Sequence, residues 1–215
     1  MIRSKEELID RVAEERVWRI REISELKKIF ESNTTSSTRR RVLCRSGVAL
    51  LYAHWEGFVK KAGTCFLDFV ASQRLTIKEL KGNFVTVALR GRIDQASQAK
   101  KYSAFEELTN YIRDHQESRA NLPYKNIVNT ESNLSSSVLK EICWCVGIDY
   151  SLYSTKEKFI DSKLVARRNH VAHGEAIAIS EEEFLELADE VVGLIETFRK
   201  QIENATVNES YRITA

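Results

Sequence analysis

Helix-breaking residues are scarce in this chain of 215 residues, which contains one proline and eight glycines. Chains that turn often, such as those of many-stranded sheets, need more of both residue types. Their scarcity therefore favours long helices. The length suits one domain with a substantial core, and we expect a single domain over residues 1–215.

Other features that the sequence lacks bear on where the protein is located and on what it can bind. No apolar run approaches the roughly 18 residues expected of a membrane span. The first residues, MIRSKEELID, lack the apolar centre of a signal peptide, so we expect a cytoplasmic protein. The four cysteines show no zinc-finger spacing, and we expect reduced, mostly buried thiols. With a net charge of +2, any nucleic-acid binding must come from a local basic patch.

Four long helices are predicted from apolar spacing and capping residues. A capping box at 4–7 opens a helix that runs to about Phe30. After a polar linker at 31–37, Thr38 caps a longer helix that runs to about Ala71 and carries apolar side chains every three or four residues. A third helix is expected over 155–173, ended by Gly174, and a fourth after the capping box at 180–183.

The segment between the second and third long helices is predicted to be an insert of shorter elements over 73–136. Residues 84–89 (FVTVAL) are compatible with a strand or a helix, and we favour a helix because the run continues without a turn. A capping box at 103–106 predicts a helix to about Glu117, and residues 119–133 are a predicted loop. Ser135 to Ser137 are predicted to cap a short helix over 138–146, which Gly147 ends, and a frayed tail is expected over 204–215.

These elements predict an all-α fold, an up-and-down bundle of four main helices with shorter inserted helices.

One stretch, LVARRNHVAHGE at 164–175, places cationic and titratable groups beside apolar ones. Asn169 and His173 are four residues apart and share a helix face, with Arg168 at its edge. Imidazole can take or give a proton near neutral pH, and guanidinium holds phosphate oxygens in a bidentate fork. This combination suits RNA cleavage by the substrate's own 2′-OH, without a metal or cofactor. Basic residues in the last turn are also an ordinary preference of helix C-termini.

The hexapeptide RNHVAH, from Arg168 to His173, has the form R-N-x-x-A-H and resembles the Rx4–6H signature of HEPN-domain proteins. AHWEGFVK at 53–60 resembles the second helix of stand-alone prokaryotic HEPN-like nucleases, and NLSS at 133–136 and VGID at 146–149 are also similar to that group. The resemblance implies an all-α homodimer with a site in the dimer cleft, where Arg and His of both subunits converge. It also implies a metal-independent endoribonuclease that acts as a toxin or phage-defence effector, with an antitoxin or defence-system partner. The expected products carry 2′,3′-cyclic phosphate and 5′-OH ends.

The resemblance also implies roles for single residues. Arg168 would clamp the phosphate, His173 would act as the acid/base or phosphate-orienting group, and Asn169 would position His173 or a phosphate oxygen. Arg167 and His170 are accessory candidates beside them.

Glu56 is a further accessory candidate, because an unpaired carboxylate among apolar neighbours is costly. It either pairs with Arg167 or Arg168, or it faces solvent beside Lys60. The chain departs from the family pattern at Glu175, where toxins controlled by a nucleotidyltransferase antitoxin often have a tyrosine. Regulation through modification of such a tyrosine is therefore not expected.

Two other interpretations remain open. The first is a non-catalytic HEPN module for protein interaction or RNA binding. The second is a helical bundle unrelated to nucleic acid, in which Arg168 and His173 lie on a solvated surface far from any symmetry axis.

Overall fold

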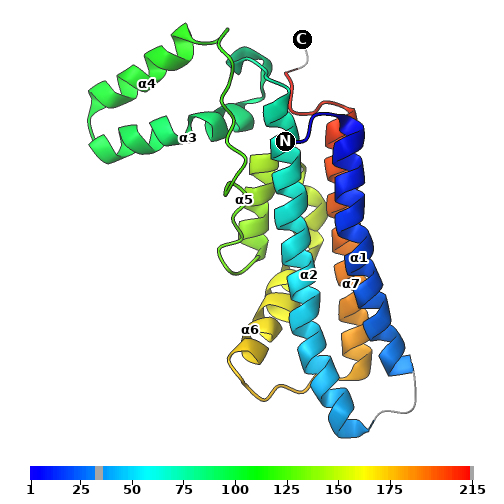
Figure 1. Cartoon of the computed structure of the whole chain (residues 1–215). Coiled ribbons are helices and arrows are strands. Elements are labelled where there is room, and N and C mark those ends of the chain that lie inside the picture. Colours follow the sequence, from blue (N-terminus) through cyan, green and yellow to red (C-terminus); the bar gives the residue numbers. More distant parts are fainter. Residues whose placement is uncertain (32–35, 214–215) are drawn as a thin grey trace.

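Three long helices form the body of the protein (Figure 1). The computed structural model describes residues 1–31 and 36–213. Helices α1 (Lys5–Glu31), α2 (Ser37–Ser72) and α7 (Glu181–Val207) pack along one another, with α1 antiparallel to the other two (Figure 1). The shorter α5 (Ser136–Val146) and α6 (Ala166–Ala172) contact α2. The described residues contain no β-strand, so the all-α prediction is confirmed.

Helix α2 is the central element, because its apolar side chains cover more than one face. Trp55 and Phe58 are fully buried, and both rings meet Phe198 of α7 at a centroid distance of 6.3 Å. Burying each such ring contributes about 1.5–3 kcal/mol. A Cβ at Gly47 would lie 2.5 Å from a ring carbon of Phe184, so α2 and α7 approach closely here because this residue has no side chain.

The predicted caps form at the starts of α5 and α7, but not at those of α2 and α4. Ser180 and Glu183 form the predicted capping box at the start of α7, and Ser135 caps α5. Ser36, rather than Thr38, caps α2 by accepting a hydrogen bond from Arg39 N. The rest of the predicted linker, residues 32–35, lies outside the described residues.

The inserted segment forms a hairpin of α3 (Gly82–Ala99) and α4 (Tyr102–Asp114) that projects from the bundle (Figure 1). The predicted helix at 84–89 is confirmed as part of α3. The capping box at 103–106 does not form, because α4 starts earlier, with Lys101 at the N-cap position, and ends at Asp114. No residue of α4 is buried.

The third long helix is not continuous, contrary to the expectation for 155–173. A 3₁₀-helix η2 (Tyr150–Lys156) and a π-helix η3 (Phe159–Val165) precede α6. Tertiary contacts override the local preference here. The buried Tyr153 donates a hydrogen bond to Gln201 Oε1, and Asp161 accepts hydrogen bonds from the backbone and side chain of Ser136. The 3₁₀-helix η2 is wound more tightly than an α-helix and the π-helix η3 more widely, and this winding accommodates both contacts.

The expectation of a frayed tail from residue 204 is wrong for the described part of that segment. Helix α7 continues to Val207, and Tyr211 is 1% exposed, with its ring against Phe66 and Phe69. The backbone N of Ile213 donates to the Glu79 carbonyl, which ties the end of the chain to the segment before α3. Among the described helices, none is long and apolar enough to cross a membrane.

Candidate functional site

Helix α6 and its C-cap residue His173 carry the RNHVAH motif, and α6 packs against α2. Leu164 and Val165, just before it, are buried in the core. On the α7 side, Arg167 Nη2 lies 2.7 Å from Glu183 Oε1. The hydrogen bond from Arg167 is the main reason that the pKa of Glu183 lies below its usual value. This ion pair links α6 to the first turn of α7.

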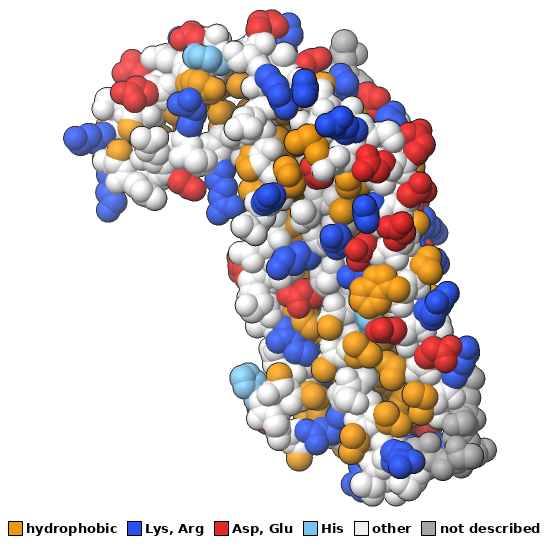
Figure 2. All heavy atoms as spheres, viewed as in Figure 1, with side chains coloured by type: hydrophobic (Ala, Val, Ile, Leu, Met, Phe, Trp, Pro, Cys, Tyr) orange, Lys and Arg blue, Asp and Glu red, His pale blue; other side chains and the backbone are white. Residues whose placement is uncertain are grey.

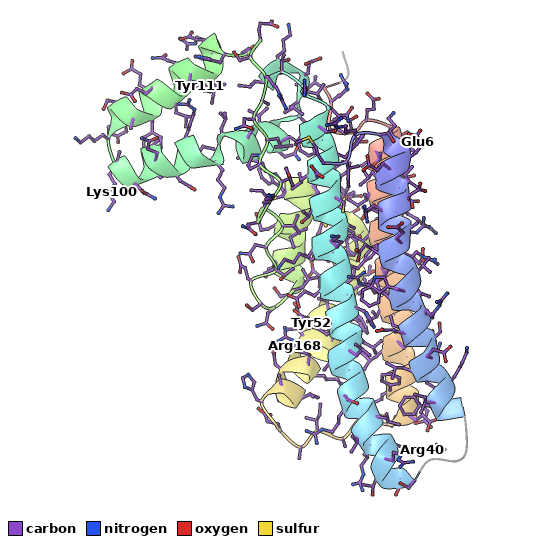
Figure 3. All side chains as sticks on the ribbon, in the orientation of Figure 1. Glu6, Arg40, Tyr52, Lys100, Tyr111 and Arg168 are labelled. Carbon is purple, nitrogen blue, oxygen red and sulfur yellow. The ribbon has the colours of Figure 1, made fainter. Side chains whose placement is uncertain are left out.

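Arg168 turns to the other side, toward α2 (Figure 3). Its guanidinium carbon lies 4.0 Å from the centroid of the Tyr52 ring, and its Nη2 donates a hydrogen bond of 2.6 Å to the Ser132 carbonyl. A cation over an aromatic face contributes about 0.5–2 kcal/mol. The Nε atom of Arg168 is buried and has no hydrogen-bond partner among the described residues.

The groups that hold Arg168 are themselves fixed. The Tyr52 hydroxyl accepts a hydrogen bond of 2.6 Å from the backbone N of Leu134, and burial raises the pKa of Tyr52. Tyr52 therefore stays neutral at physiological pH. Ser132 and the preceding Glu131 have left-handed backbones, with φ of 63° and 51°. Arg168 thus joins α6, α2 and the loop before α5.

His173 lies at the end of α6 and is exposed. Its backbone N donates to the Asn169 carbonyl at 2.9 Å, and its ring makes no hydrogen bond or ion pair with any described residue. The amide of the half-buried Asn169 is likewise without a partner among them. Gly174, with φ of 76°, ends the helix as predicted. Its N donates to Val171 and that of the next residue to His170, which is a Schellman cap.

The accessory candidates are dispersed. His170 is exposed, and its ring contacts the carboxylate of Glu175. Glu56 is half-buried, and no described Lys or Arg lies within ion-pair distance of it. The expected pair between Glu56 and Arg167 or Arg168 does not form, because Glu183, Tyr52 and Ser132 already hold those arginines. The alternative pair with Lys60 is also absent from the described residues.

A cavity of about 530 Å³ lies between η3, α6 and α7. Its lining has charges of both signs, including Lys163, Arg167, Glu183 and Glu190, and it includes neither Arg168 nor His173. Within the described ranges, no group of three His, Cys, Asp or Glu side chains is placed to hold a metal ion.

Sequence reasoning placed Arg168, Asn169 and His173 at the end of one helix, as in the structure, but it missed the contacts of Arg168 with Tyr52 and Ser132. Tyr52 could have been considered from the sequence, because Tyr52, Glu56 and Lys60 are spaced four apart and such residues lie near one another on a helix. The Ser132 carbonyl carries none, since its position depends on two left-handed residues within a loop.

The chain matches the family model of the MAE_28990-like HEPN family over residues 8–211. The protein therefore belongs to the HEPN family. No curated protein sequence and no solved structure matches it.

Proposed function

We propose that the protein is a metal-independent endoribonuclease that acts as a homodimer. HEPN domains are generally associated with ribonuclease activity, and this chain matches the family over nearly its whole length. The observation that carries the proposal is the arrangement at the end of α6. Arg168 is held rigidly there, while the Asn169 amide and the His173 ring remain free of partners among the described residues.

In the proposed reaction the RNA supplies its own nucleophile. The 2′-oxygen attacks the adjacent phosphorus, so a 2′-O–P bond forms and the P–O5′ bond breaks. His173 of one subunit takes the proton of the 2′-OH, and the same residue of a second copy gives a proton to the departing 5′-oxygen. Each such proton transfer contributes about 10²–10⁴-fold to the rate. The products carry 2′,3′-cyclic phosphate and 5′-OH ends.

Arg168 stabilises the charge that develops on the phosphate oxygens. Guanidinium has five N–H donors, and the bond to Ser132 uses only one of them. The position of the guanidinium over the Tyr52 ring holds the fork against α2. Asn169 supplies an amide that orients either His173 or a phosphate oxygen.

We propose a toxin or phage-defence role, with an antitoxin or defence-system protein as a partner. A toxic ribonuclease requires control, and the proposed control acts through such a partner. Glu175 occupies the position of the modifiable tyrosine and contacts His170, so the proposal includes no modification there.

The test is RNA cleavage in the presence of EDTA by the wild type, Arg168→Ala and His173→Ala. We expect at least a hundredfold loss of rate in each variant, because each loses a group that acts on the phosphate or its protons. His115→Ala is the matched control, since His115 is an exposed histidine at the end of α4 and should leave the rate unchanged.

The proposal would be overturned if both Arg168→Ala and His173→Ala cleaved RNA at the wild-type rate. It would also be overturned if the protein remained a monomer in sedimentation at high concentration.

One observation favours a second candidate, a non-catalytic HEPN module. The Arg168 guanidinium already serves the fold by joining α2, α6 and the loop before α5. In that case Arg168→Ala lowers stability, and no RNA is cleaved by the wild type with or without metal ions.

A further inference from the structure

A second concave surface, which we call the lysine groove, lies between α1, α2 and the loop that follows α4. Its volume is about 460 Å³. The polar and charged residues that line it are Arg19, Lys60, Lys61, Thr64, Lys125 and Asn126. Every charged residue of this lining is a cation.

The cations of the groove differ in how they are engaged. Arg19 is nearly buried, pairs with Glu15 at 2.5 Å, and lies with its guanidinium carbon 4.2 Å from the Trp18 ring centroid. Arg19 therefore forms part of the wall of the groove and is not available to an external anion. Lys60, Lys61 and Lys125 are exposed, and none has a carboxylate within ion-pair distance among the described residues. These three ammonium groups are available to an external anion.

The lysine groove and the surroundings of Arg168 both involve α2 and the loop before α5. Along α2, Lys60 follows Tyr52 by eight residues, or about 12 Å, and the half-buried Glu56 lies between them. The loop that contributes Lys125 to the groove also contributes the Ser132 carbonyl to Arg168. Figure 2 shows Lys and Arg side chains, with an acidic side chain among them, on the flank of the molecule where Figure 3 places Tyr52 and Arg168.

We propose that the lysine groove binds the phosphate backbone of single-stranded RNA next to the scissile phosphate. This inference rests on the proposed function. Lysine is a flexible point charge that neutralises phosphates without reading sequence. The Thr64 hydroxyl and the Asn126 amide can donate to phosphate or sugar oxygens. A protein partner would need a desolvated apolar anchor, and the groove lining is mainly cationic and polar.

The experiment measures binding of a labelled single-stranded RNA across a series of salt concentrations. His173→Ala is the background, so that the RNA stays intact. In the test variant Lys60, Lys61 and Lys125 are all changed to Gln. For single strands, the slope of log affinity against log salt is about −0.7 per neutralised phosphate, so we expect it to become shallower by about 2. At low salt the affinity should fall at least tenfold.

The matched control changes Lys101, Lys158 and Lys200 to Gln, which removes the same charge at exposed positions outside the groove. In this control variant the slope of log affinity against log salt should be unchanged. An unchanged slope in the groove variant, or an equal change in the control, overturns the groove assignment.

Cleavage by the wild type is measured alongside binding. If the wild type cleaves RNA and the groove variant binds like its background, the groove assignment fails and the ribonuclease stands. If the wild type does not cleave RNA, but the slope of log affinity against log salt becomes shallower in the groove variant, the proposed ribonuclease activity is wrong. The groove then remains the RNA-binding surface of a non-catalytic module.

Discussion

His54 is a titratable side chain enclosed by the body of the protein. It is 2% exposed, meets the Trp18 ring edge-on, and has its Nε2 3.1 Å from Glu22 Oε2. Burial lowers the pKa of His54 below its ordinary value of 6.5, and the nearby charge of Arg19 lowers it further, whereas Glu22 acts in the opposite direction. His54 is therefore neutral in the folded protein at physiological pH.

This burial predicts a pH dependence of stability. The unfolded chain binds a proton at the ordinary histidine pKa, whereas the folded protein binds it only at a lower pH. The contribution of His54 to the free energy of unfolding should thus be constant above about pH 6.5. It should decrease as the pH drops from there toward the lowered pKa. Urea unfolding over this range should show a shallower decline in His54→Gln than in the wild type.

His115→Gln is the control for that series, because this exposed histidine should leave the decline unchanged. An equally steep decline in His54→Gln would assign the pH dependence to other groups.

Close approach of helices depends on glycine at one contact between α2 and α7. A methyl group at Gly47 would overlap the Phe184 ring, whereas one at Gly193, on the exposed side of α7, would meet no atom within 4 Å. The two positions therefore separate packing from helix propensity.

Gly47→Ala should destabilise the protein by about 1–3 kcal/mol, because the two helices must separate or the ring must leave its preferred rotamer. Gly193→Ala should stabilise it by roughly 0.5–1 kcal/mol, because alanine loses less backbone entropy in a helix. Chemical denaturation of both variants measures the difference. Similar effects of both changes would show that Phe184 does not limit the approach.

The helices were predictable from sequence where their signals are local. The capping box at 180–183 and the cap at Ser135 need only a few consecutive residues, and both form. The continuous helix expected over 155–173 fails because contacts made by Asp161 and Tyr153, with residues 25 and 48 positions away, set the local winding. Likewise, the end of α6 was predictable, but the stacking of Arg168 on Tyr52 joins residues far apart in sequence.

The end of the chain is part of the core of the whole molecule. The Tyr211 ring packs at 5.9 Å from Phe69 and 6.3 Å from Phe66, which lie near the end of α2. Lys5, at the start of α1, lies 2.9 Å from Glu209. The tail thereby connects α1, α2 and the segment before the α3–α4 hairpin.

Tyr211→Ala should lower the free energy of unfolding by about 3–5 kcal/mol, as expected when a large aromatic side chain is removed from a core. Tyr102→Ala is the matched control, since that tyrosine is 95% exposed and should change stability by less than about 0.5 kcal/mol. Thermal or urea unfolding gives both values. A loss of under 1 kcal/mol in Tyr211→Ala would mean that the tail docks weakly.

The π-helix η3 determines the direction in which the end of α6 faces. A π turn holds about one more residue than an α turn, so winding η3 as an α-helix with its residues unchanged would rotate α6 by about one residue, or roughly 100°. Arg168 would then swing off the Tyr52 ring, although neither side chain had been altered. The orientation of the motif thus depends on the winding of a neighbouring segment that contains none of the motif's residues.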